Sequence, residues 1–127
     1  MVDAVEFAAR HVLPQLPHHQ KIESLALHPT CSSTRLGLGE TLEAVARRVA
    51  ERVEVPENWG CCAFAGDRGM LHPELTESAT RAQAADVAAI DATAHASCNR
   101  TCELAMTRAT GKAYRHVLEL LEERTRP

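Results

Sequence analysis

The fold is indicated most directly by the stretch Ile22-Glu23-Ser24-Leu25-Ala26-Leu27-His28-Pro29-Thr30-Cys31. Its first six residues form a short, mainly apolar run, which is typical of a buried strand. Pro29 favours an extended conformation for the residue before it, so we expect the strand to end there. Cys31 therefore lies just past the carboxyl end of a predicted strand.

Similar short runs along the chain predict further strands, and apolar residues at helical spacing predict helices between them. Asn99 is a suitable cap for the helix that carries Cys102 in its first turn, and Gly111 is a suitable end for it. The other three strands are expected at 52–55, 90–96 and 112–115. Helices are expected over about 3–13, 34–51, 74–89, 100–110 and from 117 to 121, before a polar frayed tail over 122–127.

This alternation of helices and strands predicts an α/β fold with a small, mostly parallel sheet of about four strands flanked by helices. Because aromatic residues make up only 3% of the 127 residues, the core must be built from aliphatic side chains. The length suits a single cysteine-rich domain over 1–127. In the helix at 74–89, a stripe of small or apolar residues is expected to pack on the sheet: Leu75, Ala79, Ala82, Ala85 and Ala89.

Composition and charge narrow the class of function. The formal net charge of −3 and the lack of a basic run argue against a nucleic-acid partner. No apolar run approaches the roughly 18 residues that a transmembrane helix needs, and the N-terminus lacks the features of a signal peptide. We therefore expect a cytoplasmic protein, in which thiols stay reduced and five cysteines indicate metal or redox chemistry rather than a disulfide framework.

The cysteines centre on the loop Trp59-Gly60-Cys61-Cys62-Ala63-Phe64-Ala65-Gly66-Asp67-Arg68-Gly69. Two adjacent side chains can address one centre only if the backbone turns sharply, and the flanking glycines permit such turns. Ligands of parallel sheets gather outside the carboxyl ends of the strands. Cys31, Cys98 and Cys102 follow predicted strands, so we expect them to converge on this loop.

Several thiolates from separate segments suit a soft metal. Zinc would take three or four of them in a tetrahedron, whereas an iron–sulfur cluster is held by cysteine thiolates around inorganic sulfide. His28 is a further candidate ligand, because imidazole suits zinc and His28 lies three residues before Cys31. The alternative for His28 is a purely structural role at the end of the strand.

Five segments together resemble a known family: His28–Cys31, Cys61–Gly66, His72–Leu75, Asn99–Cys102 and His116–Leu121. They resemble the cysteine-rich "CCG" domain of heterodisulfide reductase subunits and glycolate oxidase iron–sulfur subunits. The sequences His-Pro-Thr-Cys and Asn-Arg-Thr-Cys-Glu are most similar to the C-terminal domain of bacterial FAD-linked D-lactate dehydrogenases. The resemblance covers nearly the whole chain.

The resemblance implies an electron-transfer module, with Cys31, Cys61, Cys62 and Cys102 as ligands of an iron–sulfur cluster of the 4Fe–4S type. Such a module would be a C-terminal domain of a larger oxidoreductase. Its partners would be an FAD-binding and a ferredoxin-like domain, and its acceptor a quinone or cytochrome. The FAD would belong to the parent enzyme, so this chain alone would not oxidise D-lactate or another 2-hydroxy acid. The parent enzyme could place it at the inner membrane.

Two positions depart from the family pattern. Ala63 stands where the family has the glycine of Cys-Cys-Gly, and Cys98 lies one position earlier than the first cysteine of the usual Cys-x-x-Cys. Cys98 therefore remains an additional candidate ligand. Two alternatives stay open, namely a zinc-binding or metal-free docking module of the same enzyme, and a thiol–disulfide relay that pairs Cys61 or Cys62 with Cys31 or Cys102.

Overall fold

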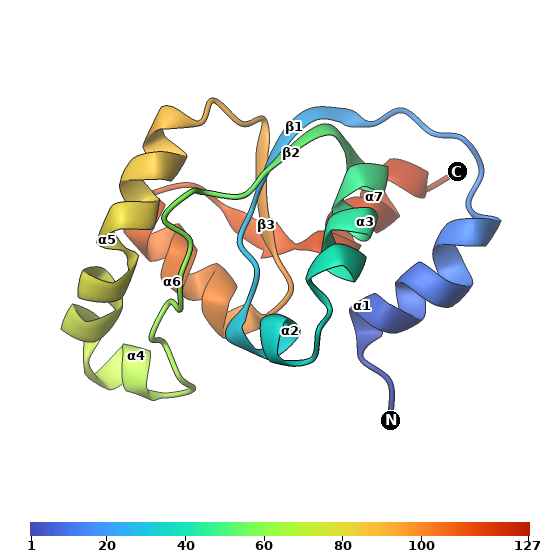
Figure 1. The fold of residues 1–127 in the computed structure, drawn as a ribbon. Coiled ribbons are helices and arrows are strands. Elements are labelled where there is room, and N and C mark those ends of the chain that lie inside the picture. The colour runs from blue at the N-terminus through green and yellow to red at the C-terminus, as the bar shows by residue number, and fades with distance from the viewer.

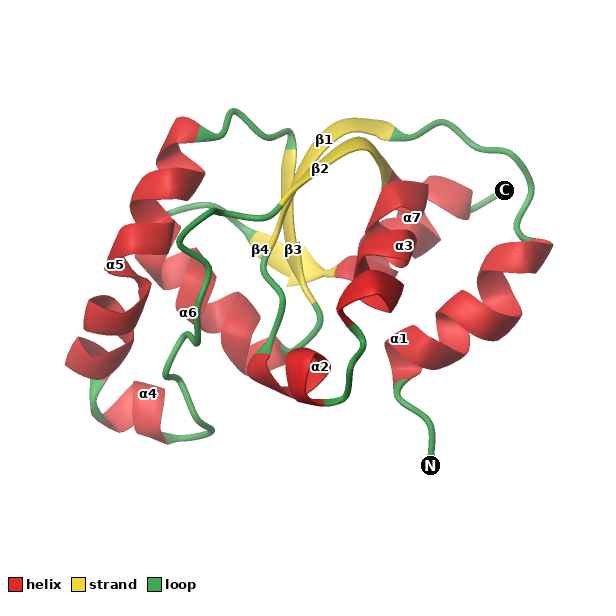
Figure 2. Ribbon diagram, viewed as in Figure 1, coloured by secondary structure: helices red, strands yellow, loops and turns green.

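Four parallel strands form one sheet at the centre of the computed structural model, which describes residues 1–127 (Figures 1 and 2). The strand order is β2-β1-β3-β4, so β1 is paired with both β2 and β3. The predicted α/β class with a parallel sheet is confirmed. The strands are β1 Ile22–Leu27, β2 Ala50–Glu54, β3 Ala94–Ser97 and β4 Tyr114–His116.

Helices cover both faces of this sheet. Figure 1 shows α1, α3 and α7 on one face and α4, α5 and α6 on the other, while α2 lies at the edge where β1 ends. Because the strand order reverses between β1 and β3, the carboxyl ends of these two strands border the crevice where such sheets bind ligands. The helices are α1 Ala4–Phe7, α2 Cys31–Arg35, α3 Gly39–Val49, α4 Arg68–Leu71, α5 Pro73–Ala89, α6 Arg100–Thr110 and α7 Val117–Thr125.

The main core lies between the sheet and the face formed by α1, α3 and α7. It is a cluster of 12 buried residues, all of them aliphatic, as the low aromatic content predicted. Leu25 and Leu27 of β1 meet Leu42 and Val45 of α3 there, each fully buried. The opposite face holds only two smaller clusters, of four and three residues.

Two predicted helices have a different form. The helix expected over 34–51 is wrong as one element, because Gly37 adopts a left-handed φ of 69° and separates α2 from α3. The helix expected over 3–13 begins as α1, continues as a π-helical turn over Ala8–Val12 and ends as a 3-10 turn over Leu13–Gln15. The 3-10 turn accommodates Pro14, which lacks the amide proton an α-helix would need.

The prediction of which face of α5 is buried is also wrong. Its buried positions are Thr76, Thr80, Gln83 and Val87, whereas Leu75 remains 41% exposed. In an alanine-rich helix, two stripes have nearly equal apolar character, so the pattern does not select the inner one. The buried stripe therefore carries three polar side chains into the interior of the protein.

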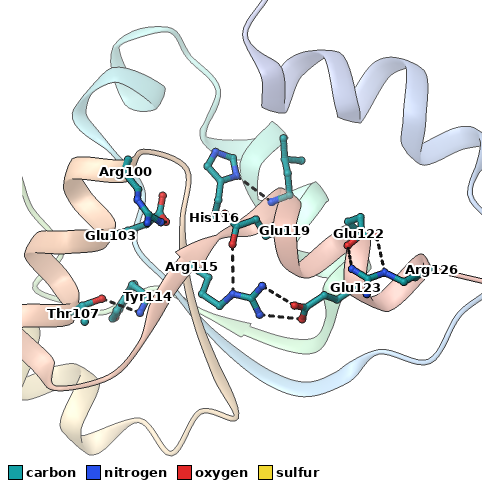
Figure 3. A network of polar contacts seen from close by, with 11 residues as sticks. Arg100, Glu103, Thr107, Tyr114, Arg115, His116, Glu119, Glu122, Glu123 and Arg126 are labelled. Atoms are coloured by element: carbon teal, nitrogen blue, oxygen red, sulfur yellow. Dashed lines mark hydrogen bonds and ion pairs between the residues drawn. The ribbon is translucent and has the colours of Figure 1, made fainter.

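The polar end of the chain is helical rather than frayed, since α7 continues to Thr125. Figure 3 shows the ion pairs that hold it. Arg115 of β4 contacts Glu123 at 2.6 Å, and Arg126 contacts Glu122 at 2.5 Å. These contacts lower the pKa of both glutamates, with the hydrogen bond from arginine as the main cause. None of the helices in the structure is long and apolar enough to cross a bilayer.

Candidate metal centre

The first wall of the site is the segment that follows β1. The amide of His28 donates a hydrogen bond to the carbonyl of Ala96 at 2.8 Å, so the strand pairing with β3 continues one residue past β1. Thr30 then caps α2 in a reciprocal capping box with Ser33. Cys31 is the first residue of α2 and is half-buried. Its position past the strand end agrees with the sequence-based expectation.

The second wall is the loop that follows β2. The indole Nε1 of Trp59 donates to the carbonyl oxygen of Pro29 at 2.6 Å, which fastens the loop to the end of β1. The side chain of Asn58 donates to both carboxylate oxygens of Asp86 at 3.1 Å, which fastens the loop to α5. The cysteine pair that follows is therefore held from both sides.

Backbone turns follow the two adjacent cysteines directly. Ala63, Ala65 and Gly66 adopt left-handed φ values of 55°, 45° and 68°. The chain therefore turns at Gly66, as predicted, but also at two alanines, each at a cost of roughly 1–2 kcal/mol. Cys62 is buried while Cys61 is exposed, so the pair spans the inside and the rim of the site.

The end of the cysteine loop packs against α6. Phe64 is fully buried, and an added Cβ at Gly69 would lie 2.5 Å from its ring. Only glycine permits this close approach. The guanidinium of Arg108 donates to the carbonyl of Gly69 at 3.2 Å and lies over the Phe64 ring, 6.0 Å from its centroid.

The third wall is the start of α6. Asn99 caps this helix as predicted, because its side chain accepts a hydrogen bond from the amide of Thr101 at 3.0 Å. Cys102 lies in the first turn and is buried. It packs with Cys62, Phe64 and Ala105 in one of the two small clusters.

Three of the predicted side chains meet at the centre of the site. The ligand atoms of His28, Cys62 and Cys102 lie within 4.8 Å of one another, and all three residues are buried. The Sγ atoms of Cys62 and Cys102 are 3.4 Å apart. We call these residues the inner trio. A histidine and two cysteines are ligands that zinc, iron and other soft or borderline metals accept.

The two thiols of the inner trio differ in acidity. Cys62 is the more acidic of the two, because the hydrogen bond with Cys102 is the main cause that lowers its pKa, with further contributions from His28 and the amide of Phe64. The pKa of Cys102 is raised in turn, first by Cys62 and then by burial. The lowered pKa favours the thiolate form of Cys62, which is the form that binds a metal.

Cys31 and Cys61 form an outer pair at the rim of the site. The neighbouring Cys61 thiol is the main cause that raises the pKa of Cys31 to about 11, burial is the second cause, and Cys62 adds to it. The four cysteines that the family resemblance implies as ligands therefore gather at one edge of the sheet. Together with His28, they provide five donors.

Cys98 lies at the same edge but faces another way. Its Sγ is 3.6 Å from the hydroxyl of Thr30, and its side chain packs against the main core. Burial raises the pKa of this thiol, while the hydroxyls of Thr30 and Ser33 partly offset the effect. The structure thus does not bring Cys98 into the inner trio.

Gln83 is the residue of this site that sequence analysis missed. It is fully buried on α5, and its Oε1 lies 3.0 Å from Nδ1 of His28. Its Nε2 donates to the carbonyl of Gly60 at 3.3 Å. The sequence feature that could have indicated its burial is its helical spacing from Thr76, Thr80 and Val87. These four residues form the buried stripe of α5.

Comparisons with protein-family models, with curated proteins and with solved structures find no match to this chain.

Proposed function

We propose that the chain is an iron–sulfur electron-transfer module of an FAD-linked dehydrogenase that oxidises D-lactate or a related 2-hydroxy acid. The observation that carries the proposal is the gathering of Cys31, Cys61, Cys62, Cys102 and His28 at one edge of the sheet. When bound, an iron–sulfur cluster would accept and release single electrons. The four cysteines are its ligands in this proposal, and His28 is a further donor beside Cys62 and Cys102.

The number of donors supports a cluster over a single ion. A tetrahedral zinc ion takes four ligands, and the site offers five soft or borderline donors. Each iron of a cluster binds its own thiolate, so a cluster uses donors spread over a wider area than one ion does. The outer pair, Cys31 and Cys61, extends the donor set beyond the inner trio in this way.

The backbone at Ala63 supports the family resemblance. Its φ of 55° lies in the left-handed region, which favours glycine. The family pattern has glycine at this position of Cys-Cys-Gly, so the conformation found here is the one that such a glycine would permit. The turn thus fits the motif even though the residue differs.

The proposal assigns the remaining parts of the reaction to other domains. The flavin would take the electrons of the 2-hydroxy acid in an FAD-binding domain, because the flavin carries that chemistry. A ferredoxin-like domain would neighbour this module, and a quinone or cytochrome would accept the electrons. In this proposal the enzyme works in the cytoplasm, at the inner membrane when its acceptor is a quinone.

A zinc site is the second candidate, and the inner trio favours it. Two thiolates on one tetrahedral zinc with bonds of about 2.3 Å lie roughly 3.8 Å apart. The 3.4 Å between Cys62 and Cys102 is close to this separation. In that case the metal would stabilise a docking module of the same enzyme, with one outer cysteine as the fourth ligand.

Anaerobic reconstitution with iron and sulfide tests the proposal. We expect a brown protein that contains both iron and acid-labile sulfide, whereas a colourless chain with stoichiometric zinc would support the second candidate. Cys62→Ser is expected to abolish the colour. Cys98→Ser is the matched control, because the Cys98 thiol contacts Thr30 and packs against the main core, and it should keep the colour.

Thiol counting under a mild oxidant tests the relay alternative on the same preparations. A single disulfide between Cys62 and Cys102, formed reversibly in a chain that takes up neither iron nor zinc, would contradict the metal proposal and favour the relay. Five free thiols after the same treatment would exclude the relay.

A further inference from the structure

The side chain of Gln83 connects two of the walls of the site. It extends from α5, where it is fully buried, and contacts both His28 after β1 and Gly60 in the cysteine loop. Burial of an amide is unfavourable unless its polar atoms are paired. Both polar atoms of this amide are paired. One partner, His28, is itself a candidate metal ligand, and the other, Gly60, directly precedes Cys61 in the chain.

The two contacts determine which way the amide points. The carbonyl of Gly60 can only accept a hydrogen bond, so the atom of Gln83 that faces it at 3.3 Å must be the NH₂ group. The oxygen Oε1 then faces Nδ1 of His28 at 3.0 Å. Because this oxygen can only accept, Nδ1 must carry a proton. The lone pair of the neutral ring is therefore on Nε2.

The position of the ring makes Nε2 the useful nitrogen. His28 is 1% exposed, and its ligand atom lies within 4.8 Å of the sulfur atoms of Cys62 and Cys102. The ring of Trp59 lies nearby, with 6.5 Å between ring centroids. With Nδ1 engaged by Gln83, the nitrogen left for a metal beside the two thiols is Nε2.

We infer that Gln83 is a positioning residue that holds His28 in the Nδ1–H tautomer and thereby makes Nε2 a metal ligand together with Cys62 and Cys102. The inference rests on the proposed function, since it needs a metal at the inner trio. Histidine ligands of metals commonly donate their other N–H to a fixed acceptor, which orients the ring. Gln83 also holds Gly60, so the histidine and the cysteine loop keep their relative positions through one side chain.

Nitrogen NMR of the histidine rings in the zinc-loaded, 15N-labelled 127-residue chain tests this inference. Zinc serves as the probe because it is diamagnetic and binds thiolate and imidazole. In the wild type we expect His28, assigned with His28→Asn, to show a protonated Nδ1 and a metal-bound Nε2. Gln83→Met keeps the side-chain length but removes the acceptor, so it should lose the single tautomer and weaken zinc binding by about 10- to 100-fold.

Two further variants separate positioning from general stability. Gln83→Glu keeps an acceptor for Nδ1 while it removes the donor to Gly60, so it should retain the wild-type tautomer, and it is the readout if Gln83→Met fails to fold. Gln20→Met is the matched control, because Gln20 is exposed and precedes β1 at the opposite edge of the sheet. It should change neither the ring spectrum nor zinc affinity.

The outcomes distinguish this inference from the function on which it rests. If zinc binds but sits on Nδ1, or if His28 does not contact it, the inference is overturned and the metal site stands. An unchanged His28 spectrum and unchanged zinc affinity in Gln83→Met overturn it equally. If the wild type binds neither zinc nor iron, the inference and the proposed function both fail.

Discussion

The two faces of the sheet differ in how they are packed. The face under α1, α3 and α7 is a continuous aliphatic core of 12 residues. The face under α5 and α6 has small clusters and buried polar groups, and it contains all the buried side-chain atoms without a hydrogen-bond partner, on Thr76, His95, Glu103 and Tyr114. The first face supplies stability, while the second provides the polar environment of the proposed metal site. Variants on the two faces should therefore separate folding from metal binding.

The largest effect is expected for Leu42→Ala in the aliphatic core. Leu42 is fully buried on α3, and loss of such a side chain costs about 2–5 kcal/mol through lost burial and a cavity. We expect a lower free energy of unfolding in denaturant titration, with unchanged metal content per folded chain. Leu75→Ala is the control, since Leu75 is 41% exposed and should lose much less. A loss of metal in folded Leu42→Ala would contradict the separation of the faces.

Gly69→Ala should affect both stability and metal binding. The new methyl group would meet the ring of Phe64 at 2.5 Å, and such overpacking costs about 1–3 kcal/mol. Because Phe64 packs with Cys62 and Cys102, its displacement should also weaken zinc binding, measured by competition with a chromophoric chelator. Gly39→Ala has free space around the new atom and should leave zinc affinity unchanged. Equal zinc affinity in both variants would show that the ring does not hold the cysteines in place.

Ala63→Gly is expected to stabilise the chain by about 1 kcal/mol, because it relieves a left-handed alanine with a φ of 55°. Metal content should be retained, since no ligand changes. Ala85→Gly makes the same substitution inside helix α5, where we expect a destabilisation of about 1 kcal/mol. Thermal unfolding of the two variants measures the contrast, and a destabilised Ala63→Gly would mean that the methyl group makes a necessary contact.

The smallest effect is expected for Tyr114→Phe on the polar face. The hydroxyl of Tyr114 is buried and unpaired, while the backbone amide of this residue donates to Thr107 at 3.0 Å (Figure 3). Removal of an unpaired hydroxyl should change the free energy of unfolding by less than about 1 kcal/mol and is expected to be neutral or stabilising. Denaturant titration measures it, and a larger loss would indicate that the hydroxyl is bound by water or by a partner.

Sequence patterns predicted the parallel α/β fold and the approach of Cys102 to the cysteine loop, because both follow from short apolar runs and the residues directly after them. Strand ends place His28 and Cys31 at the correct edge, and Asn99 starts α6 as expected. The burial of Gln83 could not be predicted in this way, because it depends on which face of an alanine-rich helix turns inward. The split at Gly37 was missed because a glycine near a helix start is also compatible with a continuous helix.

The orientation of the Cys98 side chain could not be predicted from the sequence either. It follows β3 directly, yet its thiol packs against Thr30 and the main core rather than the inner trio. Side chains one residue apart at a strand end point to different faces, so a shift of one position changes what they contact.

The anchor between Trp59 and Pro29 makes the site observable by fluorescence. Trp59 is the only tryptophan of the chain, its indole nitrogen is fixed at 2.6 Å from a backbone oxygen, and its ring lies 6.5 Å from that of His28. A coloured centre bound at this distance would quench its emission by energy transfer, while a colourless ion would leave the emission nearly intact. The protein therefore carries an intrinsic optical reporter that can distinguish a cluster from zinc during loading, without any label.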